Sequence, residues 1–200
     1  MNPDEYEIVG EHFRWIKATS EIEDARARDG SRRSDSEYSA KVDVYEDRVR
    51  YWFLDIAKSH LANGSAPGDY VGLSIGLAYI EGVEQYRQGK PTPRKQSGQW
   101  FKASARRLFP LADDQAVNRL WGAVRNGLFH SGFTKGPTLL SHDRPDAIAI
   151  SGHYLIINPT RFVDVVIEDF KSYIDVLRDN PSGDEAAKFV ALWDNQWNAT

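Results

Sequence analysis

The sequence contains no cysteine, and this absence excludes several kinds of site. Without cysteine the chain can form no disulfide framework, no thiolate metal site and no cysteine nucleophile. The longest uncharged and largely apolar run, Tyr70 to Ile80, is shorter than the roughly 20 residues that cross a bilayer. The first eleven residues are acidic and polar, unlike a secretory leader. These absences predict a cytoplasmic protein with no membrane span.

The composition is that of an ordinary globular chain. Of 200 residues, 41% are hydrophobic and 27% are charged, which excludes wholesale disorder and a collagen-like structure. This length suits one domain or one domain with an appendage. A polar stretch rich in turn residues, Ala25 to Ser36, is typical of a linker. We therefore divide the chain into an N-terminal extension and linker, 1–35, and a helical domain, 36–200.

Hydrophobic spacing predicts helices over most of the second part. The first predicted helix begins after Ser36 or Ser39, either of which could cap it, and ends near Asn63. Further helices are predicted over 69–88, 96–109, 113–130, 159–179 and 183–197. Alternating β-branched residues around Ser151-Gly152 predict a β-hairpin within 146–158. The expected fold is mainly α, an up-and-down helical bundle with a small β-hairpin insertion near 146–158.

The formal net charge is −4, but the charges are unevenly distributed. Residues 85–112 contain no acid and seven bases. A mildly acidic chain can therefore carry a local basic surface suited to a polyanion. The candidate RNA-binding residues in this window are Arg94, Lys95, Lys102, Arg106 and Arg107. The alternative for the window is a solvated helix face, with Trp100 and Phe101 as core aromatics rather than stacking platforms.

The most specific local feature is the segment from Arg125 through Asn126 to His130 at the end of a predicted helix. It would offer a cation for a phosphate, an amide to position it and an imidazole to move a proton. Such a set suits metal-independent cleavage of RNA, in which His130 deprotonates a ribose 2′-hydroxyl and Arg125 stabilises charge on the phosphate. The ordinary alternative is a surface cation beside a hydrogen-bonded histidine. Arg125 and His130 also lie about 140° apart around a regular helix.

This segment resembles the R-x4-6-H signature of the HEPN superfamily, including the polar residue after the arginine. The resemblance implies a bundle of four to five helices, and a homodimer in which two motifs face each other across a two-fold axis. Arg125, Asn126 and His130 would then be the catalytic residues. One toxin subgroup extends the motif with a tyrosine two residues after the histidine; here that position is Gly132.

Three functions follow as hypotheses. The first is a HEPN-like endoribonuclease of a toxin or defence system, with RNA as substrate, a second copy as partner, and an antitoxin or other protein as regulator. The second is a non-catalytic HEPN module that binds RNA, a nucleotide or a protein. The third is a helical scaffold. No metal site and no cofactor are expected, because the sequence lacks a metalloprotease motif, a P-loop and a dinucleotide fingerprint.

Overall fold

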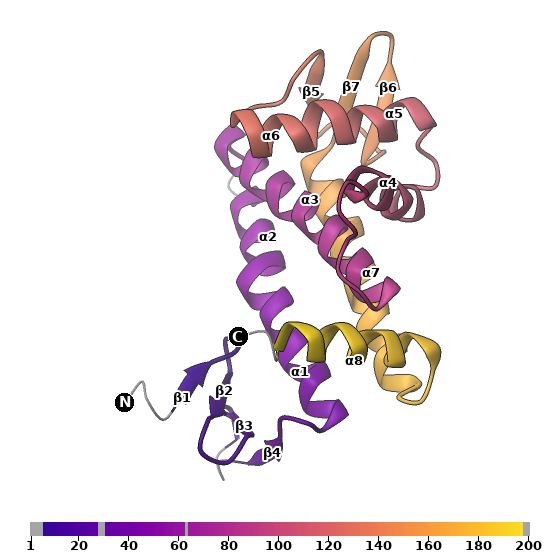
Figure 1. Ribbon diagram of the computed structural model, residues 1–200. Coiled ribbons are helices and arrows are strands. Elements are labelled where there is room, and N and C mark those ends of the chain that lie inside the picture. Colours follow the sequence, from indigo (N-terminus) through magenta and orange to yellow (C-terminus); the bar gives the residue numbers. More distant parts are fainter. Residues whose placement is uncertain (1–5, 28–30, 63, 198–200) are drawn as a thin grey trace.

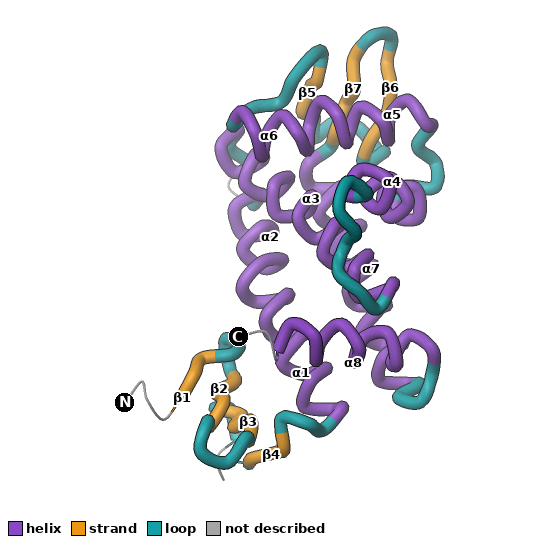
Figure 2. The backbone as a smooth tube through the Cα atoms, in the orientation of Figure 1, coloured by secondary structure: helices purple, strands orange, loops and turns teal. Residues whose placement is uncertain are grey.

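The computed structural model describes residues 6–27, 31–62 and 64–197, and it contains two sheets as well as helices (Figure 1). The prediction of a mainly α bundle with one small hairpin is therefore wrong, and the fold is α+β. Figure 2 shows the two sheets at opposite ends of the helical body, one beside α1 (Tyr38–Val49) and one beside α5 (Asp114–Arg119).

The first sheet is antiparallel and follows chain order. Its strands are β1 (Tyr6–Ile8), β2 (Phe13–Ile16), β3 (Glu21–Asp24) and β4 (Arg32–Ser34). These strands are short and the last two are mostly charged, so they lack the apolar alternation from which strands are predicted. Charge pairs between neighbouring strands contribute to this sheet instead. Arg32 of β4 lies 4.0 Å from the carboxylates of both Glu21 and Glu23 of β3. Strand β4 lies within the predicted linker, Ala25 to Ser36. Residues 28–30 of that linker lie outside the described residues.

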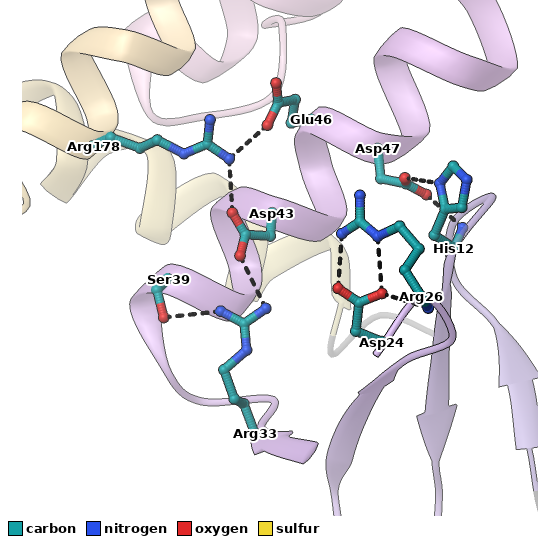
Figure 3. A network of polar contacts seen from close by, with 9 residues as sticks. All are labelled: His12, Asp24, Arg26, Arg33, Ser39, Asp43, Glu46, Asp47 and Arg178. Carbon is teal, nitrogen blue, oxygen red and sulfur yellow. Dashed lines mark hydrogen bonds and ion pairs between the residues drawn. The ribbon is translucent and has the colours of Figure 1, made fainter. Parts of the chain in front are cut away.

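Ion pairs and hydrogen bonds attach this sheet to the helices (Figure 3). The backbone amide of His12 and its Nδ1 lie 2.9 and 2.7 Å from the carboxylate of Asp47, which is only 3% exposed. Arg33 of β4 pairs with Asp43 of α1 at 2.9 Å, and Asp43 also accepts a hydrogen bond from Arg178 at 2.8 Å. The polar N-terminal segment is thus joined to α1 and, through Asp43, to the last turn of the helix that carries Arg178.

The second sheet has the strand order β5-β7-β6. Its strands are β5 (Thr138–Leu140), β6 (Ile148–Ser151) and β7 (Tyr154–Ile157). The predicted hairpin is confirmed as β6 and β7, joined at Gly152 with a φ of 58°. Strand β5 pairs in parallel with β7. It was missed because three residues carry too little periodicity and their partner lies further along the chain.

The predicted helices are confirmed, with small shifts at their ends. Helix α1 continues through a π-helical segment, η1 (Arg50–Leu54), into α2 (Asp55–Leu61). Helix α5 likewise continues through η2 (Leu120–Arg125) into α6 (Asn126–Ser131). The remaining helices are α3 (Ala66–Gln88), α4 (Ser97–Leu108), α7 (Pro159–Asp179) and α8 (Asp184–Trp197).

Helix α3 packs against both α2 and α7 through glycines. A Cβ atom on Gly76 would lie 2.8 Å from the ring of Phe162, and one on Gly72 would lie 3.0 Å from Leu61. A Cβ atom on Gly82 would meet no heavy atom within 4 Å. Helix α3 contains four glycines, of which Gly68, Gly72 and Gly76 permit close approach of a neighbour, whereas Gly82 does not serve that purpose.

We expect the substitutions Gly76→Ala and Gly82→Ala to change stability in opposite directions. The first forces a methyl group against a buried ring, and overpacking of a core costs about 1–3 kcal/mol, only part of which the better helix propensity of alanine offsets. The second adds up to about 1 kcal/mol of stability, because its methyl group meets open space. Urea unfolding of both variants measures the difference. Equal free energies of unfolding would contradict this account of the packing.

Candidate active site

The predicted motif lies on the continuous helical segment formed by α5, η2 and α6. Asp113 begins this segment, since its Oδ1 accepts a hydrogen bond from the backbone amide of Ala116 at 2.7 Å. Gly132 ends it with a left-handed φ of 74°. Both ends lie close to the bounds predicted from the sequence, 113 and 130. The π-helical turn η2 ends at Arg125, directly before Asn126. Such turns frequently mark functional sites.

Gly127 fixes the position of the motif helix against the chain that follows it. A Cβ atom at this position would lie 2.5 Å from the carbonyl oxygen of Phe133. The backbone amide of Lys135 donates to the carbonyl oxygen of Ala123 at 2.8 Å. The returning segment therefore packs directly on the backbone of the motif, and a larger residue at Gly127 would displace it.

Arg125 points from the end of η2 onto α3, where it forms a two-point ion pair with Glu81. Its Nη2 lies 2.9 Å from Oε2 of Glu81, and its Nε donates to Oε1. A third contact runs from Nη1 to Oδ1 of Asn126 at 3.1 Å. The side chains of Arg125 and Glu81 are 17% and 25% exposed, so the pair is partly shielded from water. These contacts fix the guanidinium in one orientation.

Two aromatic rings flank this guanidinium. Its central carbon lies 4.9 Å from the ring centroid of Trp121 and 5.1 Å from that of Phe129, within the range of cation–π attraction. The sequence carries a signal for these contacts, because Trp121 and Phe129 lie four residues before and after Arg125 and so share its helix face.

His130 lies one turn beyond the arginine, on α6, and is exposed. Among the described residues no hydrogen bond or ion pair involves its ring, and none joins it to Arg125. This is the separation expected for residues five apart on a helix. Within one chain, the structure brings Asn126 to Arg125 and leaves His130 apart from them.

The predicted basic residues fall into two groups along α4. Arg94 and Lys95 are exposed and precede the helix, while Lys102 is half-buried within it. Within the described part of the chain, none of the three side chains makes an ion pair. A Cβ atom on Gly98 would lie 3.0 Å from the ring of Trp121, so this end of α4 lies beside the ring that flanks Arg125.

The other two basic residues lie at the far end of α4 and are neutralised by acids. Arg106 pairs with Asp114 at 2.8 Å, and Arg107 pairs with the half-buried Asp169 of α7. Phe101 is fully buried, as expected for a core aromatic. The structure therefore leaves Arg94 and Lys95 exposed in the loop before α4 and directs Arg106 and Arg107 into ion pairs.

The remaining histidines of the second half lie away from the motif. The Nε2 of His142 lies 3.0 Å from a carboxylate oxygen of the buried Asp69, and its Nδ1 lies 3.2 Å from the hydroxyl of Thr160. These contacts join the segment after β5 to α3 and to the first turn of α7. The ring of His153 packs beside Tyr154 at 4.1 Å. Within the ranges that the structure describes, no three metal-ligating side chains form a group that could hold a metal ion.

An apolar face lies on α3 between Ile75 and Tyr86. A cavity of about 280 Å³ there is lined almost entirely by apolar and aromatic side chains, among them Phe53, Ile75, Ala78 and Tyr86. Phe53 is 48% exposed. Burial raises the pKa of Tyr86 to about 12, which reflects the low polarity of this wall of the cavity. Exposed rings beside an apolar cavity are typical of a surface that another molecule covers.

No protein-family model, no curated protein and no solved structure matches this chain. Within the described ranges, no helix is both long and apolar enough to cross a membrane.

We expect a measurable coupling free energy between Arg125 and Glu81. A double-mutant cycle with Arg125→Ala and Glu81→Ala, followed by urea unfolding, should give about 1–2 kcal/mol, between the values of exposed and buried ion pairs. The Arg106–Asp114 pair is the matched control, because its side chains are 49% and 77% exposed. Its coupling should stay below about 0.5 kcal/mol. Equal coupling in the two cycles would contradict the shielded character of the first pair.

Proposed function

We propose that this protein is a HEPN-type, metal-independent endoribonuclease that acts as a homodimer. One observation carries the proposal: the Arg125 guanidinium is fixed by Glu81 and Asn126, and an exposed imidazole that bonds to none of the described residues follows one turn later on the same helix. A fixed cation and an available base are the two groups that RNA cleavage without a metal requires. A place in a toxin or defence system belongs to the same proposal and rests on the motif alone.

The reaction assigns a separate role to each group. His130 takes the proton from a ribose 2′-hydroxyl, whose oxygen forms a bond to the adjacent phosphorus while the bond from phosphorus to the 5′-oxygen breaks. Water gives a proton to the leaving 5′-oxygen, and the protonated His130 returns its proton to solvent. Arg125 stabilises the charge that develops on the phosphate, since its guanidinium has more N–H donors than Glu81 and Asn126 occupy. The need for a 2′-hydroxyl restricts the substrate to RNA.

A second copy would complete the site. Because Arg125 and His130 diverge within one chain, the arginine of one copy and the histidine of the other must share a cleft. The apolar face on α3 supports a second copy as partner, since a two-fold contact there would cover Phe53. The uncovered cations Arg94 and Lys95 then supply contacts to neighbouring phosphates.

The Glu81 contact favours the second candidate, a non-catalytic module. Glu81 neutralises Arg125, and an arginine that stays paired with a carboxylate attracts a phosphate less strongly. In that case the same surface would bind RNA, a nucleotide or a protein without cleaving RNA. A cleavage experiment separates the two functions.

We expect the wild-type protein to cut single-stranded RNA in the presence of EDTA and to leave the all-deoxy analogue intact. His130→Ala should reduce the rate at least about 100-fold, the usual contribution of a general base. His153→Ala is the matched control, because this exposed histidine lies on the hairpin turn, and its rate should stay within about twofold of wild type. RNA binding by both proteins with cleavage by neither would establish the non-catalytic module instead.

Mixing two inactive variants tests whether the cleft is shared. Arg125→Ala and His130→Ala homodimers lack one required group at every site, whereas a mixed dimer regains one complete site. After exchange of subunits the mixture should recover about a quarter of the wild-type rate, because half of the dimers are mixed and each has one of two sites. A mixture that stays inactive although subunit exchange is shown would contradict a shared cleft.

A further inference from the structure

The outer edge of β6 offers unpaired backbone groups. Leu155 and Ile157 of β7 direct their backbone toward β5, since the amide of Leu155 donates to Pro137 and the carbonyl of Ile157 accepts from Ser141, each at 2.9 Å. Their partners across the hairpin are Ile150 and Ile148. In an antiparallel ladder, such residues direct their N–H and C=O groups away from β7.

The hydrogen bonds of the neighbouring pair agree with this direction. The amide of Asn158 donates to the carbonyl oxygen of Ala147 at 3.0 Å, so Ala147 is hydrogen-bonded across the hairpin. Every second residue along the strand shares this state, and the N–H and C=O groups of Ile148 and Ile150 between them point outward. Within the described ranges, no backbone hydrogen bond meets these groups from the outer side. An edge of this kind is a template for one more strand.

A groove runs along this edge. Its volume is about 460 Å³, and its walls are the β6 segment 145–150 and the loop 108–113 between α4 and α5, with Val165 of α7 between them. Leu111 projects from the loop and is 92% exposed. The groove therefore combines outward backbone groups with apolar walls, the two features by which an extended peptide is bound at a sheet edge. It shares no residue with the Arg125 site.

The negative charge of this groove distinguishes three possible occupants, namely a second copy of the chain, RNA and a basic peptide. Among the described residues that line it, only Asp113 and Asp146 are charged, and Asp146 is exposed with no described partner. Paired edge to edge, a second copy would bring acid toward acid, and RNA would bring phosphate toward acid. A peptide with basic residues beside its apolar side chains complements the groove instead.

We propose that the β6 edge and this groove bind an extended, basic-flanked peptide segment of a partner protein, which adds as a fourth strand beside β6. Ile148 and Ile150 form the backbone hydrogen bonds. The apolar walls take alternate side chains of the peptide, and Asp113 and Asp146 contact its lysine or arginine residues. This interaction is independent of RNA cleavage.

An array of heptapeptides tests the proposal on the full-length protein. The probes carry lysine or arginine at both ends and valine or isoleucine at alternate inner positions, and a matched array replaces the basic ends by glutamate. We expect members of the basic array to bind with dissociation constants below about 1 mM, and the acidic array to bind more weakly. The absence of any basic binder in that range would overturn the proposal.

Backbone N-methylation of the best binder identifies strand addition without altering the protein. Methyl groups on the amides that face β6 should weaken binding at least about tenfold, while methyl groups on the alternate amides should change it by less than about threefold. Equal effects of the two sets would overturn strand addition. Binding should also protect the amides of Ile148 and Ile150 from hydrogen exchange. Protection of both amides in the protein alone would show that a second copy already occupies the edge.

Two protein variants complete the test. Ile150→Pro removes an outward N–H without removing a ladder hydrogen bond, and it should abolish binding, whereas Ile150→Ala keeps the N–H and should bind more strongly than the proline variant. Asp146→Lys should weaken basic peptides about fivefold, the contribution of one exposed ion pair. Unchanged binding by Ile150→Pro, in a protein whose amide spectrum shows the native fold, would place the peptide elsewhere.

Discussion

Gly72 and Gly76 bring α3 into direct contact with Leu61 of α2 and Phe162 of α7. No larger side chain fits at Gly76 without moving a buried ring, so the distance between these helices is set by the absence of a Cβ atom. The same helix presents Glu81 to Arg125. The position of the candidate catalytic arginine therefore depends on how closely α3 is packed against its neighbours.

The ion pair between Arg125 and Glu81 has two opposite effects on the binding of a phosphate. A guanidinium fixed by a carboxylate, an amide and two rings loses little conformational freedom when a phosphate binds. The carboxylate also cancels part of the charge that a phosphate would meet. The proposed function requires that RNA binds to the free N–H donors of the arginine while Glu81 stays in place. The non-catalytic alternative follows if Glu81 cancels so much of the charge on Arg125 that the arginine no longer stabilises the phosphate during cleavage.

The sequence allowed the long helices to be predicted because their apolar periods extend over many residues. The motif helix begins at Asp113 and ends at Gly132, close to the predicted bounds 113 and 130, because capping depends on local chemistry. The first sheet was missed because its strands have three or four residues, and because contacts distant in sequence, such as Arg33 with Asp43, attach them to the helices. Strand β5 was missed for the same physical reason, since its partner β7 lies beyond a hairpin.

The candidate site was predictable to the same extent. Spacing alone indicated that Arg125 and His130 diverge, and in the structure Asn126 contacts Arg125 while His130 is exposed. The partners of the basic residues could not be predicted, because Asp169 and Asp114 reach Arg107 and Arg106 only through the tertiary fold. A composition window cannot distinguish a cation that is paired across helices from one that faces solvent.

The central claim is that two copies bring their motif helices together, and the lack of cysteine makes it directly measurable. Ser131→Cys, at the exposed end of α6 beside His130, gives one spin-label site per chain. Double electron–electron resonance should then report an interlabel distance shorter than the roughly 30 Å diameter of a small domain. A longer distance, or no dipolar signal at concentrations at which the protein cuts RNA, would contradict a cleft shared by two copies.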